Sequence, residues 1–68
     1  MSEEERIKKD IALFEKSLAE LDSLSLEEHE EEVVDLAKGY CSDTTYYLEK
    51  RDYFTAFGCI NYAHGLID

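Results

Sequence analysis

Apolar residues recur every three or four positions along most of the chain, which is the spacing of amphipathic helices. In the first segment they are Ile7, Ile11, Phe14, Leu18 and Leu21. This stripe predicts a helix over residues 2–22, with three glutamates in its first turn, where the helix dipole favours anions. Ser25, followed three residues later by Glu28, has the form of a capping box, so a second helix is expected to begin at about residue 26.

The apolar stripe of the second helix continues to about residue 50. The third helix is apolar around most of its circumference. One side of the second helix carries Val33, Leu36, Ala37, Tyr40, Thr44 and Tyr47, and Val34, Cys41 and Leu48 widen this arc. Residues 53–67 carry two stripes, namely Tyr53, Ala56, Ile60, Ala63 and Ile67, and then Cys59, Tyr62 and Leu66. A helix with two apolar stripes must be covered by two neighbours. Asp52 stands where it can cap this third helix.

Connections of three to four residues make consecutive helices pack antiparallel. The sequence therefore predicts an all-α protein, an up-down-up three-helix bundle with short connections. Residues 1–68 would form one domain, with helices at about 2–22, 26–50 and 53–67. One core in a chain this short rarely contributes more than about 3–5 kcal/mol. A fourth helix, a second copy of the chain or a continuation of the third helix past Asp68 would offset that shortfall.

Charge is unevenly distributed along the chain. Seventeen acids and seven bases give a net charge of −10, and residues 1–35 hold thirteen of the acids and four of the bases. Nucleic-acid binding needs clustered Lys and Arg, so this balance argues against a direct nucleic-acid partner. No apolar run is long enough to span a membrane, and the charged start is no signal peptide. The acidic run is either a solvated helix face or a docking surface for a basic partner.

The motifs of catalysis are missing from the sequence, and no enzymatic activity is expected. There is no CxxC, Walker loop, GxSxG or GxGxxG. His29 lies among glutamates but lacks the second His, four residues away, of a zinc-binding HExxH helix, so we expect a solvated His and no metal or cofactor. Cys41 and Cys59 lie on apolar arcs and are expected to be buried free thiols.

The third helix carries a further line of candidate residues. Helix geometry places Asn61, His64 and Asp68 close together, with Phe54 and Phe57 on the same line and glycines beside it. Two interpretations are open. Phe54 and Phe57 complete the core while the polar residues face water, or all five form an interaction face for a protein partner or a second copy.

A polar pocket between the second and third helices is the alternative. Tyr40, Asp43 and Tyr47 occupy successive turns of the second helix. Asp43 either has a structural role, accepting a hydrogen bond from a tyrosine or capping a helix end, or joins Asn61 and His64 on the third helix. Together with Asp68, these residues would then form a small-ligand or metal site. One ligand's contacts cannot span much more than about 10 Å, so divergence of these residues would exclude that site.

Several motifs follow one another in the second half of the chain. They are Asp35-Leu36-Ala37-Lys38-Gly39-Tyr40, Tyr46-Tyr47-Leu48-Glu49-Lys50-Arg51-Asp52 and Asn61-Tyr62-Ala63-His64-Gly65. In this order they resemble the archaeal domain of unknown function 357 family. The resemblance implies a three-helix bundle in an archaeal cytoplasm, joined in some relatives to a nucleotidyltransferase-like domain, with no assigned activity. Arg51 stands where the family pattern has Gly, which predicts a tighter or less left-handed second connection.

Together these observations lead to one hypothesis for function. The chain is expected to be a small cytoplasmic interaction or accessory module that acts through its third helix.

Overall fold

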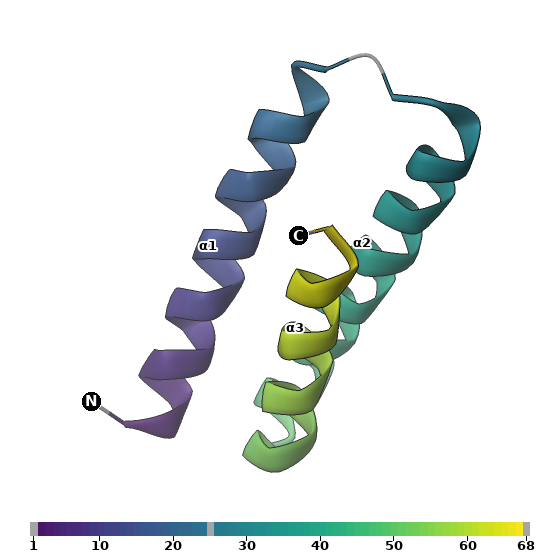
Figure 1. Cartoon of the computed structure of the whole chain (residues 1–68). Coiled ribbons are helices and arrows are strands. Elements are labelled where there is room, and N and C mark those ends of the chain that lie inside the picture. Colours follow the sequence, from purple (N-terminus) through teal and green to yellow (C-terminus); the bar gives the residue numbers. More distant parts are fainter. Residues whose placement is uncertain (1, 25, 68) are drawn as a thin grey trace.

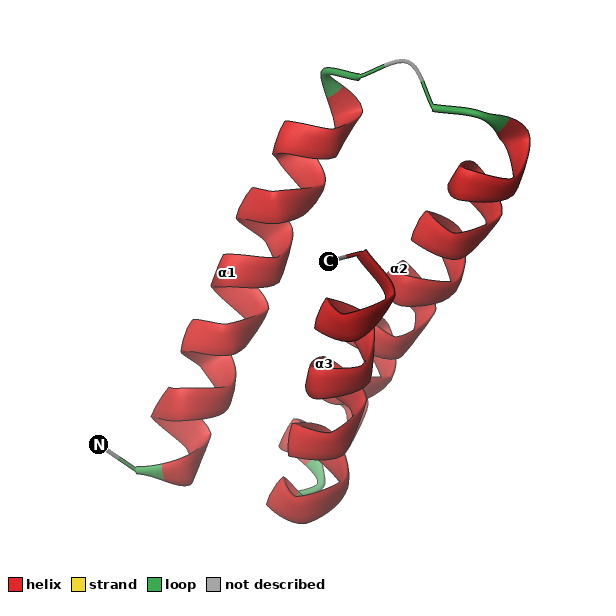
Figure 2. Cartoon of the chain, in the orientation of Figure 1, coloured by secondary structure: helices red, strands yellow, loops and turns green. Residues whose placement is uncertain are grey.

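The computed structural model describes residues 2–24 and 26–67 and contains three α-helices. They are α1 (Glu3–Asp22), α2 (Glu28–Glu49) and α3 (Tyr53–Ile67). Figure 1 shows the chain ascending through α1, descending through α2 and ascending again through α3, which lies between the other two. Only short connections separate the helices, and the described residues contain no strand (Figure 2). The predicted all-α three-helix bundle is confirmed. None of these three helices is long and apolar enough to cross a membrane.

Short polar side chains and glutamates fix where the first two helices begin. The backbone N–H of Glu5 donates to Ser2 Oγ at 3.1 Å, which caps α1. The second helix begins at Glu28, two residues later than predicted, and Ser25 lies outside the described residues. There, the backbone N–H of Glu27 donates to the Glu30 carboxylate at 3.2 Å. The capping box therefore lies two residues later than predicted, with Glu27 at the N-cap and Glu30 at the third helical position.

The connection between α2 and α3 is a tight left-handed turn. The N–H of Arg51 donates to the carbonyl of Leu48 at 3.0 Å, and the N–H of Asp52 donates to that of Tyr47 at 2.9 Å. These two bonds form a Schellman motif, which requires a left-handed residue after the helix. Arg51 adopts that conformation, with φ of 61°. Of the two predicted alternatives, a less left-handed connection is wrong, because the hydrogen-bond pattern imposes this conformation on Arg in place of Gly, and a tighter connection stays a prediction.

The start of α3 follows directly from this turn. Asp52 accepts the backbone N–H of Thr55 at 3.2 Å and its hydroxyl at 2.7 Å. The predicted cap on the third helix is therefore confirmed.

The core lies where all three helices meet, and α3 packs more extensively on α2 than on α1, while α1 and α2 touch little. Its fully buried centre consists of Phe14, Ala37, Ile60 and Ala63. Small residues between α2 and α3 allow the two helices to approach closely, whereas α1 contributes the large side chains of Ile7 and Phe14. The buried hydroxyl of Thr44 donates to the carbonyl of Tyr40 at 2.9 Å. The third helix thus packs against two neighbours, as the pattern predicts, and its stripe through Ala56, Ile60 and Ala63 is fully buried.

One end of the bundle stays open because α3 is shorter than the other helices. Its 15 residues span about 22 Å, against about 33 Å for the 22 residues of α2. Leu36, which the pattern assigns to the core, is 51% exposed at this end, and Val33 is exposed as well. The buried positions of α2 are instead Val34, Ala37 and Thr44.

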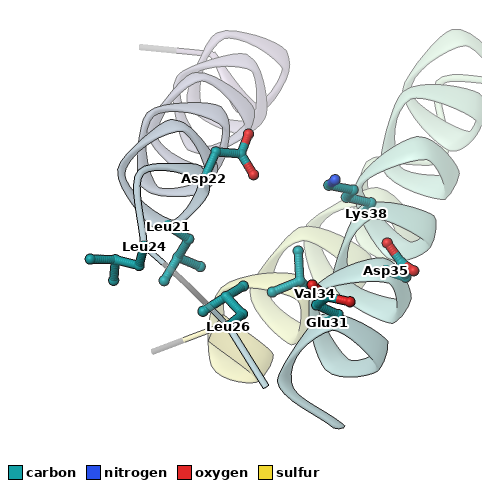
Figure 3. Close-up of a pocket in the computed structure, with 8 residues that line it drawn as sticks. All are labelled: Leu21, Asp22, Leu24, Leu26, Glu31, Val34, Asp35 and Lys38. Carbon is teal, nitrogen blue, oxygen red and sulfur yellow. The ribbon is translucent and has the colours of Figure 1, made fainter. Parts of the chain in front are cut away.

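A groove of about 290 Å³ separates α1 from α2 at the open end. Figure 3 shows that the side chains of Leu21, Leu26 and Val34 gather between the helices, whereas Leu24 points away from them. The charged side chains of Asp22, Asp35 and Lys38 also line the groove.

Candidate functional site

The solvent-facing side of α3 carries an exposed line of uncharged residues. Phe54, Gly58, Asn61 and Gly65 are all exposed, and we call them the outer strip. Their spacing of four, three and four residues keeps them on one side of the helix. Phe54 is 91% exposed, so the interpretation that it completes the core is wrong. Two residues turn a helix by about 200°, which puts Phe54 nearly opposite the buried Ala56.

The two glycines of the outer strip have no packing role within the chain. A Cβ atom added at Gly58 or Gly65 would meet no atom of the described chain within 4 Å, apart from the helix's own neighbouring residues. Glycine inside a helix costs about 0.5–1 kcal/mol relative to alanine. Contacts inside the bundle therefore do not explain why glycine stands at these two positions.

A second feature adjoins the outer strip at the N-terminal ends of α1 and α3. Glu3, Arg6, Ile7, Tyr53, Phe54 and Phe57 line a groove of about 290 Å³. Phe57 lies at the margin between core and solvent, and the Arg6 guanidinium lies 5.4 Å from the centre of its ring. This cation–π contact covers part of the Phe57 ring and does not involve Phe54.

His64 is turned toward α1 and away from the outer strip. Its Nε2 lies 3.0 Å from the backbone carbonyl of Asp10, which accepts a hydrogen bond from the protonated nitrogen. Its ring meets that of Phe14 edge to face, with centres 5.7 Å apart and planes at 85°. His64 therefore joins α3 to α1. Of the predicted interaction face, Phe54 and Asn61 lie on the outer strip, Phe57 lies at its margin, and Asp68 lies outside the described residues.

The residues of the predicted polar pocket make separate contacts in the structure. The rings of Tyr40 and Tyr62 pack with centres 4.6 Å apart, and Tyr47 packs against Tyr46. Asp43 is exposed and lies close enough to Cys59 to affect its pKa, on the side of α3 that faces α2. Because His64 faces α1, the structure places Asp43 and His64 against different sides of α3.

Both cysteines are free and partly buried. Burial raises the pKa of the Cys41 thiol, with a further contribution from the charge of Glu15. Burial also raises the pKa of Cys59, and the charges of Asp43 and Asp52 add to it. The thiolate is the nucleophilic and metal-binding form of cysteine, so both environments disfavour the reactive form.

The start of α2 brings a histidine close to two glutamates. The donor atoms of Glu27, His29 and Glu30 lie within 4.8 Å of one another, and all three side chains are exposed. His29 Nδ1 is 3.7 Å from the Glu27 carboxylate. The Glu30 carboxylate already accepts the backbone N–H of Glu27, so helix capping explains this geometry.

The structure adds one residue to the outer surface of α3 that the sequence pattern missed. The hydrophobic pattern places Tyr62 on an inward stripe, yet it is 53% exposed beside the outer strip and packs on Tyr40. The sequence does mark this helix as unusual by its lack of charged residues. Residues 53–67 contain no Asp, Glu, Lys or Arg in a chain that is 35% charged.

The fold and this surface define a small all-α module with an uncharged helix face. The chain belongs to the family described as "Protein of unknown function (DUF357)", whose match covers residues 9–68. The match confirms the resemblance carried by the motifs of the second half. Comparison with curated proteins finds no match to this chain.

Proposed function

We propose that this chain is a non-catalytic, helical protein-binding module that docks through the outer strip of α3. The observation that carries the proposal is the 91% exposure of Phe54 on a helix without charged side chains. Burying a phenylalanine side chain contributes about 1.5–3 kcal/mol, which the isolated bundle does not gain at this position. Large exposed aromatic residues are common anchors of protein interfaces.

The surroundings of the polar residues favour this function over a ligand or metal site. His64 already bonds the backbone of α1, and the raised pKa values of both thiols favour their unreactive form. The family resemblance supports a cytoplasmic module and an accessory role beside a nucleotide-handling enzyme. That role is an analogy at the level of the family.

Site-specific photo-crosslinking tests the proposal. The photoreactive amino acid p-benzoylphenylalanine replaces Phe54 in one variant and Tyr46 in the matched control. Tyr46 is also an exposed aromatic residue, at 55%, but it lies on α2. Irradiation in native cells is expected to give a discrete adduct from position 54 and none from position 46. Equal labelling from both positions, or none from position 54, would contradict a docking role for this face.

A further inference from the structure

We infer that the outer strip binds a second copy of this chain, with the two α3 helices antiparallel across a two-fold axis. The inference rests on the proposed function, because it names the partner of the same surface. Four features of the described residues carry it: the charge of α3, the shape of the outer strip, the open glycines and the area of the face.

Charge favours a second copy over a basic partner. Residues 53–67 carry no Asp, Glu, Lys or Arg, so a basic surface would find no carboxylate to pair with on α3. The acids are concentrated in residues 1–35, which form α1 and the first part of α2. Two copies that meet through α3 bring uncharged faces together. Their acid-rich segments repel at longer range, where salt screens the interaction.

The outer strip is complementary to itself. In an antiparallel pair centred between Gly58 and Asn61, Phe54 of one copy faces Gly65 of the other. Gly58 then faces Asn61, and the same pairs repeat across the two-fold axis, as an isologous interface requires. The largest side chain of the strip thus lies over a position with no side chain. A parallel pair would instead place the two Phe54 rings against each other and leave the Gly65 positions facing.

Open space at the glycines gives them a role in this arrangement. A Cβ at Gly58 or Gly65 would meet nothing within the described chain, so no contact of the bundle requires glycine there and both positions are open to an approaching neighbour. Seven residues separate the two glycines, which is two turns of helix. A neighbouring helix can therefore approach the backbone at two points along the same line.

The area of the face predicts a weak dimer. The α3 helix is about 22 Å long, and the bundle is 15–18 Å across its shorter axes. This gives roughly 400 Å² in plan for each copy, about half of the roughly 800 Å² per partner that a standard specific interface buries. We expect a dissociation constant on the order of 100 µM.

Sedimentation of the full chain tests the inference between about 10 µM and 1 mM. The mass is expected to rise from the 7.9 kDa of the single chain toward twice that value. Association is expected to strengthen from about 0.15 M to 1 M salt, because salt screens repulsion between the acidic helices. A basic partner would show the opposite salt dependence. A mass that stays at that of one chain at 1 mM would overturn the inference.

Two variants with the same composition locate the contact. Gly58→Glu places bulk and charge on the outer strip, while Gly39→Glu makes the same change on an exposed, open position of α2. Neither added Cβ meets another atom, so both variants are expected to melt no lower than the wild type. Gly58→Glu is expected to weaken dimerisation at least tenfold, and Gly39→Glu to leave it within twofold. Equal dimerisation of the two variants would contradict contact through α3.

The two proposals fail in different ways. A chain that stays monomeric but is crosslinked through position 54 to another protein refutes the second copy and leaves the docking function in place. A chain that gives no adduct at position 54 and stays monomeric refutes both. A dimer whose adduct at position 54 has twice the chain mass supports both.

Discussion

The α2–α3 pair and the packing of α1 against it are built in different ways. Small residues at the α2–α3 contact, among them Ala37 and Ala63, are fully buried, and a three-residue turn joins the two helices. By contrast, α1 is held mainly by Phe14 and Ile7 and by one hydrogen bond from His64 to a backbone carbonyl. Many small contacts therefore stabilise the packing of α2 against α3, whereas the packing of α1 depends on a few side chains.

Phe14→Ala has the largest expected effect, because it removes the main anchor of α1. Truncation of a buried phenylalanine costs about 3–5 kcal/mol, which is comparable to the whole stability expected of a chain this size. The variant is expected to have a lower helix content and a lower urea midpoint than the wild type, both measured by circular dichroism. Leu13→Ala is the control, since Leu13 is half exposed on the same helix. A Phe14→Ala midpoint close to that of Leu13→Ala would mean that other contacts hold α1.

Ala63→Leu tests the close packing of the α2–α3 pair. The alanine is fully buried against α2, so the larger side chain must force the two helices apart. Overpacking of this kind costs about 1–3 kcal/mol. A lower midpoint in urea is expected, with the free energy of unfolding falling within that range. If Ala63→Leu were as stable as the wild type, the pair would be less tightly packed than its buried alanines indicate.

His64→Ala is expected to have a smaller effect that is confined to α1. The substitution removes the hydrogen bond to the Asp10 carbonyl and the edge-on contact with Phe14, at a cost of about 1 kcal/mol. Amide hydrogen exchange is expected to accelerate in α1 before it does in α2. Asn61→Ala, an exposed change three residues away, serves as the control and should leave both rates unchanged. Uniform acceleration along all three helices would argue against a local role for His64.

Arg51→Gly is expected to stabilise the protein, and its effect is the smallest. A left-handed conformation costs a non-glycine residue about 1–2 kcal/mol. The greater flexibility of glycine in the unfolded chain offsets about 0.4–1 kcal/mol of this gain. The net increase in unfolding free energy should be about 0.5–1 kcal/mol, measured by urea denaturation. Lys50→Gly, one residue earlier and right-handed, should instead destabilise the chain.

Periodicity predicts most of the fold because each helix buries one or two regular stripes. The stripe through Phe14 and the stripe of the third helix through Ala56, Ile60 and Ala63 lie inward as expected, whereas Tyr62 of its second stripe is exposed. Leu36 departs from the pattern because the buried stripe of α2 runs through Val34, Ala37 and Thr44, which leaves Leu36 on a more exposed side of the helix. The predicted apolar arc contains both Leu36 and Val34, and periodicity alone does not determine which part of a wide arc the neighbouring helices cover. The left-handed conformation of Arg51 was likewise not predictable, because a non-glycine residue gives no left-handed signal.

The candidate site was predictable only in part. Residues 53–67 stand out in the sequence by their lack of charge, and Phe54 and Asn61 belong to the exposed line that helix geometry indicates. His64 was placed with them because it shares the same side of the helix. Its actual partner is a backbone carbonyl 54 residues earlier in the chain. Such a contact depends on how two helices pack, which periodicity alone does not determine.

The three-residue turn between α2 and α3 has a consequence for the order of folding. Closing a short loop costs little entropy, so contacts on either side of it can form rapidly. Phe14 must instead find partners on a helix far along the chain. We expect the α2–α3 hairpin to form first and α1 to dock onto it last. The outer strip would then be presented by the part of the chain that acquires its structure earliest.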